Sequence, residues 1–219
     1  MLAKRLTDII LSAFALACFL PFAPLIALAI VLESRGPVLF TQRRFGRHGE
    51  FFQIYKFRTM KTGTPNLPTD QMLKMPSPIT RVGAILRKTS LDEIPQLINV
   101  ITGDMSLVGP RPALYNQTSL NAMRDEAGVL EYPPGITGWA QINGRDELPD
   151  EKKVELDKWY CDHWNYWLDW KIMFATVGAV LTRRGIVDEK KTDGKKTDGS
   201  KTPKTKASEQ NEGTYSQRR

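Results

Sequence analysis

Two adjacent carboxylates, Asp92 and Glu93, stand shortly before a Gly-Pro-Arg-Pro sequence at residues 109–112. Two such groups about 4 Å apart repel each other by roughly 4 kcal/mol at an effective dielectric constant near 20. Cations must therefore surround them, and a magnesium ion shared with a phosphate group meets this need. We predict that Asp92 and Glu93 are catalytic residues and ligands of Mg²⁺.

The same residues also fit an ordinary structural role. Ser90 followed by Glu93 matches the Ser-x-x-Glu capping box that opens many helices, and Pro95 is tolerated in a first helical turn. A helix N-terminus attracts anions through its free N–H groups and its dipole, so the two interpretations are compatible.

Four sequence blocks occur in the order of a known family. Together they resemble the bacterial sugar transferases, which are monotopic phosphoglycosyl transferases. The blocks are Phe40–Gly46 continuing to Tyr55–Met60, Ser90–Leu97, Gly109–Pro112 and Pro134–Arg145.

The resemblance implies transfer of a phosphosugar from a UDP-sugar to polyprenol phosphate, which gives a polyprenyl diphosphosugar and UMP. This is the first membrane step of glycoconjugate assembly, at the cytoplasmic face of the bacterial inner membrane. In the mechanism that we favour, Asp92 attacks the β-phosphate and forms a covalent intermediate, with ping-pong kinetics as its fingerprint. Glu93 is assigned as metal partner or base.

Two phosphate-bearing substrates require several cations and polar groups near the acid pair. Arg111, between two prolines, is expected to clamp phosphate as a planar fork, and Arg87 is a second clamp by its family match. Most Lys and Arg residues of any protein are simply solvated, which is the competing interpretation. The predicted substrate-binding residues are Lys56, Arg58, Arg87, Arg111, Gln141, Asn143 and Arg145.

Functions from other classes stay open or are disfavoured. A non-catalytic membrane scaffold that binds nucleotide sugars is one alternative, and a phosphohydrolase that uses the same aspartate with water is another. Nucleic-acid binding is disfavoured because the basic tail lacks interleaved aromatic residues. Two cysteines and two histidines without ligand spacing give little support to disulfides or a zinc site. A homodimer is left open.

The chain carries an uncharged, apolar stretch at residues 9–32. Its 24 residues, at 1.5 Å each, reach roughly 36 Å, which is enough to cross a hydrocarbon core of about 30 Å. A straight span is the simplest interpretation, but Pro21 and Pro24 each disfavour a helix interior by about 3 kcal/mol. We predict that these prolines break the segment and bend it.

Basic residues on both sides of the stretch favour a return to the same face of the membrane. Lys4 and Arg5 precede it and Arg35 follows it, and the positive-inside rule places such flanks in the cytoplasm. A re-entrant helix-break-helix satisfies both ends. A cleaved signal peptide, with Ala27-Leu28-Ala29 as its cleavage site, is a weaker alternative because the apolar run is too long.

Three parts are predicted, within a mainly α fold that has a small β-hairpin. Residues 1–35 form the re-entrant membrane hairpin, residues 36–187 a compact interfacial catalytic domain, and residues 188–219 a disordered basic tail that repeats Lys-Lys-Thr-Asp-Gly. Strands are expected at 38–43 and 51–57, a loop at 61–78, and helices at 79–88, from Asp92, at 150–164 and at 168–184. The aromatic cluster at 159–170 suits core packing or a membrane interface.

A cysteine accessibility scan tests the hairpin. We expect cysteines introduced near Lys4 and near Arg35 to react with an impermeant thiol reagent from the same side of the membrane. Reaction from opposite sides would refute the re-entrant geometry.

Overall fold

The computed structural model describes residues 2–64, 77–144 and 148–182. Within them the chain is mostly helical with two small sheets, so the predicted fold class is confirmed at this level. The predicted tail at 188–219, and most of the predicted loop at 61–78, lie outside the described residues.

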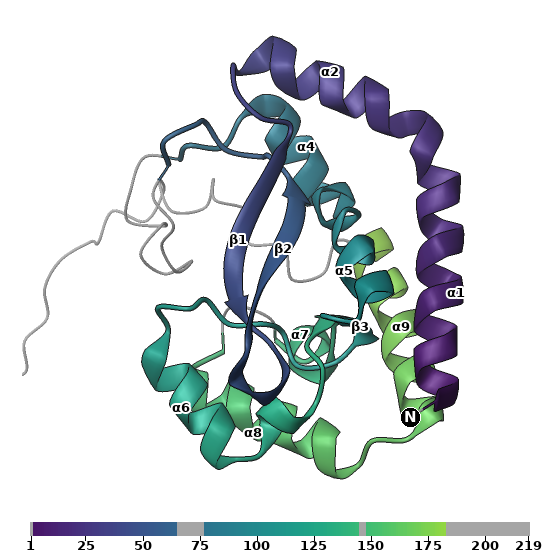
Figure 1. The fold of residues 1–219 in the computed structure, drawn as a ribbon, viewed down its shortest axis with the longest axis vertical. Helices are drawn as coiled ribbons and strands as arrows, with labels where there is room; N and C mark the ends of the chain where they lie inside the picture. Colours follow the sequence, from purple (N-terminus) through teal and green to yellow (C-terminus); the bar gives the residue numbers. More distant parts are fainter. Residues whose placement is uncertain (1, 65–76, 145–147, 183–219) are drawn as a thin grey trace, which may run out of the picture. The chain divides into compact units, whose positions relative to one another are not determined.

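The apolar N-terminal segment forms two helices with a break between them. Helix α1 spans Leu2–Phe19, a 3₁₀ turn spans Leu20–Phe22, and α2 spans Ala23–Glu33. Pro21 lies in the 3₁₀ turn and Pro24 in the first turn of α2, where a missing N–H costs least. The ribbon changes direction at this point (Figure 1). The predicted break is therefore present.

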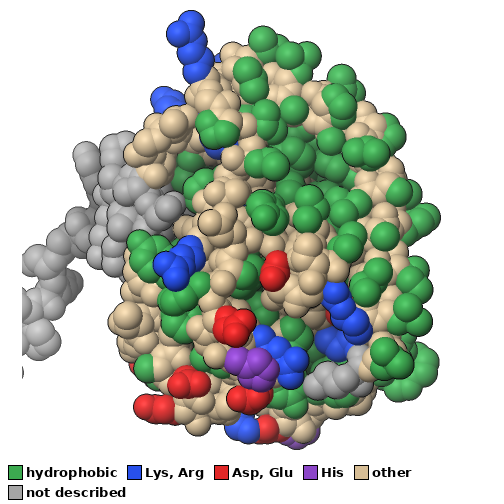
Figure 2. Space-filling view, in the orientation of Figure 1, with side chains coloured by type: hydrophobic (Ala, Val, Ile, Leu, Met, Phe, Trp, Pro, Cys, Tyr) green, Lys and Arg blue, Asp and Glu red, His purple; other side chains and the backbone are tan. Residues whose placement is uncertain are grey.

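Most of the large side chains on this segment are exposed. Hydrophobic side chains cover the surface over α1 and α2 in the space-filling view (Figure 2). Leu2–Glu33 is long and apolar enough to cross a membrane, judged by length and composition alone. Because such a surface is unfavourable in water, it marks a membrane-associated segment.

Polar contacts fasten the start of α1 to the rest of the chain. Lys4 is buried, with its ammonium 2.7 Å from the carboxylate of Asp169 and 2.9 Å from the carbonyl of Val108. Asp8 accepts a 2.8 Å hydrogen bond from the hydroxyl of Ser106. The charge of Lys4 is thus compensated within the protein, so Lys4 is not a free basic residue beside the apolar stretch.

Two small sheets connect the helices. Strands β1 (Leu39–Phe45) and β2 (Phe51–Phe57) pair antiparallel with Leu39 opposite Phe57, which confirms the predicted hairpin. Strands β3 (Ser106–Val108) and β4 (Gly135–Thr137) pair in parallel. The sequence did not predict this second sheet, because three residues are too short for a recognisable alternation.

The remaining helices agree with most of the predictions. They are α4 (Arg81–Lys88), α5 (Gln96–Thr102), α6 (Thr118–Glu126), α7 (Trp139–Ile142), α8 (Asp150–Asp162) and α9 (Tyr166–Thr182). The helix predicted to begin near Asp92 is different. Residues Leu91–Glu93 form only a 3₁₀ turn, and α5 begins three residues later.

The described residues bury three groups of apolar side chains, one of which is Ile54, Val100 and Met105. Val108, Tyr160 and Ile172 are almost fully buried beneath α8 and α9. Ile30 of α2, Phe57 of β2 and Leu86 of α4 form another cluster, which joins the apolar segment to the hairpin. Core packing is confirmed for Tyr160, whereas Trp167 is 77% exposed and a membrane-interface role for it stays a prediction.

The buried Lys4–Asp169 pair is expected to carry much of the attachment of α1. Removing one partner of a buried ion pair leaves the other charge uncompensated and costs about 3 to 5 kcal/mol. Lys4→Ala should therefore lower the unfolding midpoint strongly in thermal denaturation in nanodiscs. The matched control is Lys152→Ala, which breaks an exposed pair with Glu155 and should change stability by less than about 1 kcal/mol. Equal effects of the two changes would contradict this assignment.

Candidate active site

The acid pair follows a residue whose backbone has a left-handed conformation. Ser90, between α4 and the 3₁₀ turn, has φ 57° and ψ 17°, a conformation that non-glycine residues rarely adopt. Its side chain makes no capping hydrogen bond, so the capping box suggested by Ser90 and Glu93 is absent. Backbone contacts hold the turn instead, with Ser90 N–H donating to Arg87 and Glu93 N–H donating to Ser90. Strain of this kind gathers at functional sites.

Glu93 is bound by two cations. Its Oε1 lies 2.6 Å from Lys56 Nζ on β2 and 3.2 Å from Arg111 Nη2 in the loop after β3. Burial raises the pKa of this carboxyl, but Lys56 and Arg111 together outweigh burial and hold its pKa well below the usual range. Glu93 is thus ionised at neutral pH. Its role as metal partner or base stays a prediction.

Asp92 lies in the opposite environment. It is 8% exposed, and its carboxylate makes no hydrogen bond with the part of the chain that the structure describes. Burial raises the pKa of Asp92, and so does the neighbouring charge of Glu93, while Lys56, Arg87 and Arg111 act against this shift. The two neighbouring carboxylates therefore differ in environment. Glu93 is stabilised by two ion pairs, whereas Asp92 keeps its oxygens without a hydrogen bond among the described residues.

The Gly-Pro-Arg-Pro turn is held at its backbone. The carbonyl of Arg111 accepts a 2.7 Å hydrogen bond from Arg124 of α6, and the carbonyl of Pro112 accepts one of 2.9 Å from Arg44. Arg124 is itself buried and paired with Asp157 of α8 at 2.5 Å. These contacts fix the base of the Arg111 side chain, so its guanidinium can meet Glu93 without a large loss of freedom.

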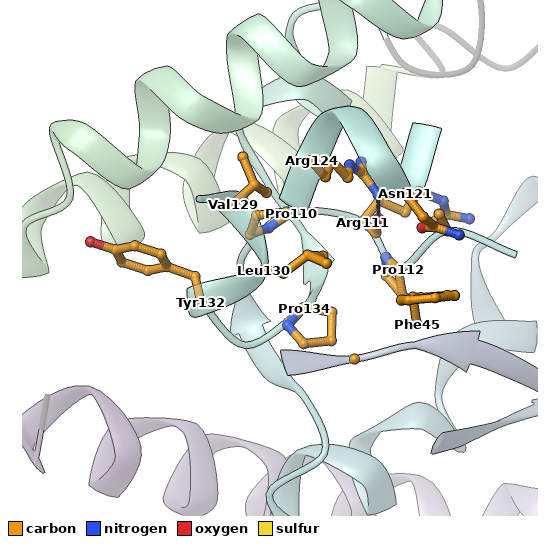
Figure 3. A pocket seen from close by; sticks show the side chains of 12 residues that line it. Phe45, Pro110, Arg111, Pro112, Asn121, Arg124, Val129, Leu130, Tyr132 and Pro134 are labelled. Atoms are coloured by element: carbon orange, nitrogen blue, oxygen red, sulfur yellow. Dashed lines mark hydrogen bonds between the residues drawn. The ribbon is translucent and has the colours of Figure 1, made fainter. Parts of the chain in front are cut away.

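A small pocket lies beside this turn. Figure 3 shows Arg111, Asn121 and Arg124 on one side of it and Pro134 on another. Asn121 Oδ1 and Arg124 Nε are buried there without a hydrogen-bond partner among the described residues. Pro110, Arg111 and Pro112 of the turn line the pocket, and the Arg111 guanidinium contacts Glu93.

Three glycines bring two of the family-like blocks together. A Cβ atom added at Gly135 would stand 2.1 Å from the backbone nitrogen of Gly109, and one at Gly138 would stand 2.1 Å from the Gly109 carbonyl. No side chain fits at such distances. The turn at Gly109 and the block that starts at Pro134 therefore touch backbone to backbone.

The basic residues predicted to bind substrate separate into two groups. Lys56, Arg87 and Arg111 all lie near the acid pair and act on the charge of Asp92. Arg58 is 6% exposed, and its guanidinium donates to carbonyls at the end of α2. It caps that helix in this structure, and its role as a substrate ligand stays a prediction.

Three further predicted residues lie on or after α7. Gln141 has both polar side-chain atoms buried without a hydrogen-bond partner among the described residues, and Asn143 donates to the carbonyl of Trp139 at 2.8 Å. Arg145 falls outside the described residues. Within the described ranges neither Gln141 nor Asn143 makes a hydrogen bond to the acid pair, so their role stays a prediction.

The acid pair fits a magnesium ion in part. Mg²⁺ commonly takes one or two carboxylates and completes its shell with waters and substrate phosphates. Both cations on Glu93 contact Oε1, and Asp92 has no hydrogen bond among the described residues, so the pair retains oxygens for a metal. Residues 2–64, 77–144 and 148–182 hold no group of three or more His, Cys, Asp or Glu side chains suited to a metal. A substrate phosphate would have to complete the shell.

The sequence analysis did not identify the residues that hold other site residues in position. Thr59 accepts a 3.0 Å hydrogen bond from Arg87 Nε, and Arg124 with Asp157 supports the turn of Arg111. Thr59 lies within the Tyr55–Met60 block, which was a usable signal. Arg124 and Asp157 lie in sequences of the kind expected for surface helices, and their separation along the chain gives no indication that they pair.

The chain is similar to known proteins of one described family. A family model described as bacterial sugar transferase matches residues 1–183. An uncharacterized sugar transferase, EpsL of Bacillus subtilis, is 44% identical over 189 residues, covering 85% of this chain and 91% of that protein. The UDP-glucose:undecaprenyl-phosphate glucose-1-phosphate transferase of Caulobacter vibrioides is 41% identical over 188 residues, with 83% and 70% covered. The undecaprenyl-phosphate galactose phosphotransferase of Salmonella typhimurium is 37% identical, and this chain spans 41% of its length.

The raised pKa of Asp92 predicts a stability effect with a definite sign. A carboxyl whose pKa is higher in the folded state binds its proton more tightly there, so it lowers stability as pH rises above the ordinary aspartate range. Asp92→Asn removes this penalty. We expect a higher melting temperature at pH 7, by about 2 to 4 °C if the gain is about 1 kcal/mol.

The gain should shrink at low pH, where both Asp92 and the unfolded chain are protonated. Differential scanning fluorimetry from pH 4 to pH 8 measures it, with the exposed Asp162→Asn as the control. A lower melting temperature for Asp92→Asn at pH 7 would show that Asp92 stabilises the fold instead.

Proposed function

The chain belongs to the bacterial sugar transferase family, and we propose that it transfers a sugar 1-phosphate from a UDP-sugar to polyprenol phosphate. The products are UMP and a polyprenyl diphosphosugar. Relatives whose names state this chemistry support the substrate pair. The observation that carries the proposal is the Asp92 carboxylate, which is buried beside Lys56, Arg87 and Arg111 and makes no hydrogen bond among the described residues.

The proposed reaction has two steps. A carboxylate oxygen of Asp92 attacks the β-phosphorus, the bond from that phosphorus to the bridging oxygen breaks, and UMP leaves with the electron pair. An oxygen of the lipid phosphate then attacks the same phosphorus and releases the Asp92 carboxylate. Both halves are substitutions at one phosphorus atom, so Asp92 is regenerated and nothing is oxidised or reduced.

Charge compensation is the main contribution of the surrounding residues. Two phosphates and two carboxylates bring several negative charges into one partly buried place, where a helix dipole of about 0.3 to 1 kcal/mol is too weak to balance them. Lys56, Arg87 and Arg111 supply three positive charges. Glu93 holds Lys56 and Arg111 in position before substrate arrives, which is electrostatic preorganisation.

Mg²⁺ is the proposed cofactor, with Asp92 and Glu93 as the residues that would hold it. A bound magnesium ion would neutralise the diphosphate and favour departure of UMP. This role is supported by the contacts of Glu93, because Lys56 and Arg111 both bind Oε1 and leave Oε2 for the metal.

The membrane segment is proposed to enter one leaflet and return. Both of its ends attach to the same catalytic part, α1 through Lys4 and α2 through Ile30 and Glu33. A straight span would send those ends to opposite sides. The break at Pro21 and the exposed apolar side chains support the same geometry. We further propose that the catalytic part lies at the cytoplasmic face of the inner membrane. The domain limits at residues 35 and 187 stay predictions.

The competing functions give different products. A scaffold would bind UDP-sugars without releasing UMP, and a phosphohydrolase would release sugar phosphate without any lipid acceptor. The buried Asp92 carboxylate favours catalysis over scaffolding, because a protein that only binds anionic sugars has no need of a carboxylate beside their phosphates.

Purified protein in nanodiscs, with Mg²⁺, polyprenol phosphate and a panel of UDP-sugars, tests the proposal by measurement of UMP. Wild type should turn over at least one sugar, and Asp92→Asn should lose activity by about 10³-fold or more and form no covalent adduct in mass spectrometry. Lys88→Ala removes a charge at the end of α4, four residues before Asp92, and is the control that should retain activity within a few-fold. Near-normal turnover by Asp92→Asn would rule out this nucleophile.

A further inference from the structure

The last residue of the apolar segment caps the helix that carries Arg87. Glu33 ends α2, and its two carboxylate oxygens accept hydrogen bonds of 2.7 and 2.8 Å from the backbone N–H groups of Arg81 and Val82. These are among the free donors at the start of α4, and a carboxylate suits the positive end of a helix. Arg87 lies in the last turn of the same helix.

Arg58 fastens α2 to the end of β2. Its guanidinium donates to the carbonyls of Ile30, Ser34 and Arg35, with a distance of 2.9 Å to Arg35. The residue is buried, so these bonds are shielded from water. The free carbonyls at the C-terminus of a helix need such donors. The end of the apolar segment is therefore held by the side chain of Arg58, directly after β2, and its own residue Glu33 binds the start of α4.

Thr59 follows directly and joins the same elements. Its hydroxyl accepts a 3.0 Å hydrogen bond from Arg87 Nε, and its carbonyl accepts one of 3.0 Å from the N–H of Thr80. A Cβ atom added at Gly83 would stand only 2.0 Å from that carbonyl, so α4 touches the Thr59 backbone directly. Because Thr59 is buried, its hydroxyl is a fixed acceptor rather than a mobile one.

We propose that the end of α2 positions Arg87 for the reaction, with Thr59 as the residue that orients its guanidinium. The inference rests on the proposed function, in which Arg87 binds phosphate. An arginine has several rotatable bonds, and a hydrogen bond at Nε fixes its plane while the two terminal nitrogens stay directed at the ligand. Glu33 and Arg58 then connect the end of the membrane segment to the elements that hold Arg87.

The first test separates orientation from folding. Thr59→Val keeps the shape of the side chain but removes the acceptor for Arg87, so kcat/KM for the UDP-sugar should fall about tenfold or more, with KM raised. The KM for polyprenol phosphate should change by less than twofold. Thr59→Ser should restore activity to within about threefold. Thr64→Val, which removes an exposed hydroxyl bonded to Lys61, is the control and should behave as wild type.

Three results would overturn the role of Thr59. They are unchanged UDP-sugar kinetics in Thr59→Val, a failure of Thr59→Ser to restore them, or an equal loss for both substrates, which would indicate a smaller folded fraction. Absence of UMP release by wild type would instead refute the proposed function, so the two failures are distinguishable.

The second test does not need activity. Glu33→Gln keeps the length of the side chain but leaves one acceptor oxygen for two N–H groups. Amide hydrogen exchange of the peptide over Arg81–Lys88 should then be about tenfold faster, while the α8 peptides stay unchanged. Glu155→Gln is the control, since Glu155 pairs with Lys152 on the surface. Unchanged exchange in Glu33→Gln would refute the connection between α2 and α4.

Discussion

The cost of placing negative charges together in a partly buried site governs this structure. Glu93 is stabilised by two close cations, and that stabilisation fixes where Lys56 and Arg111 stand. Asp92 receives the same positive field from a greater distance and keeps its carboxylate without a hydrogen bond among the described residues. One acid therefore organises the basic residues of the site, and the other is the nucleophile in the reaction that we propose. A pair of equally compensated carboxylates would offer a weaker nucleophile, because each would be bound by its own partners.

Charge compensation at the site requires long-range packing. Lys56 comes from a hairpin, Arg87 from the end of α4, and Arg111 from a turn whose backbone is held by Arg124. The apolar segment takes part in this packing, since Ile30 shares a buried cluster with Phe57 and Leu86. Membrane attachment and active-site geometry thus depend on the same contacts. A lipid-seated segment that is also part of the core is a direct way to keep the acid pair near a membrane-bound substrate.

Local features of the fold were predictable from sequence, and long-range ones were not. The hairpin at 39–57, the break at Pro21 and the helices α4, α8 and α9 follow from alternation, proline chemistry and periodicity. The sheet of β3 and β4 depends on glycines that permit backbone contact across 29 positions of sequence, from Ser106 to Gly135, and no local pattern shows this. The expected capping box failed because Ser90 takes a left-handed conformation that its residue type does not announce.

The site was predicted by residue type better than by arrangement. Resemblance to a family selected Asp92, Glu93, Lys56, Arg87 and Arg111, and the structure brings these five together. Arg58 shows the limit of such reasoning, because a buried arginine that caps a helix and one that binds phosphate look alike in a sequence. The supporting threonine and the Arg124–Asp157 pair are visible only once distant segments are folded together.

The ion pair between Lys4 and Asp169 joins residues 165 positions apart. During translation the first helix leaves the ribosome long before its acidic partner has been made, so its ammonium group must wait in contact with water or lipid headgroups. Closure of the domain is consequently a late event that depends on the last described helix. The attachment of α1 to the domain therefore follows synthesis of nearly all of the described chain.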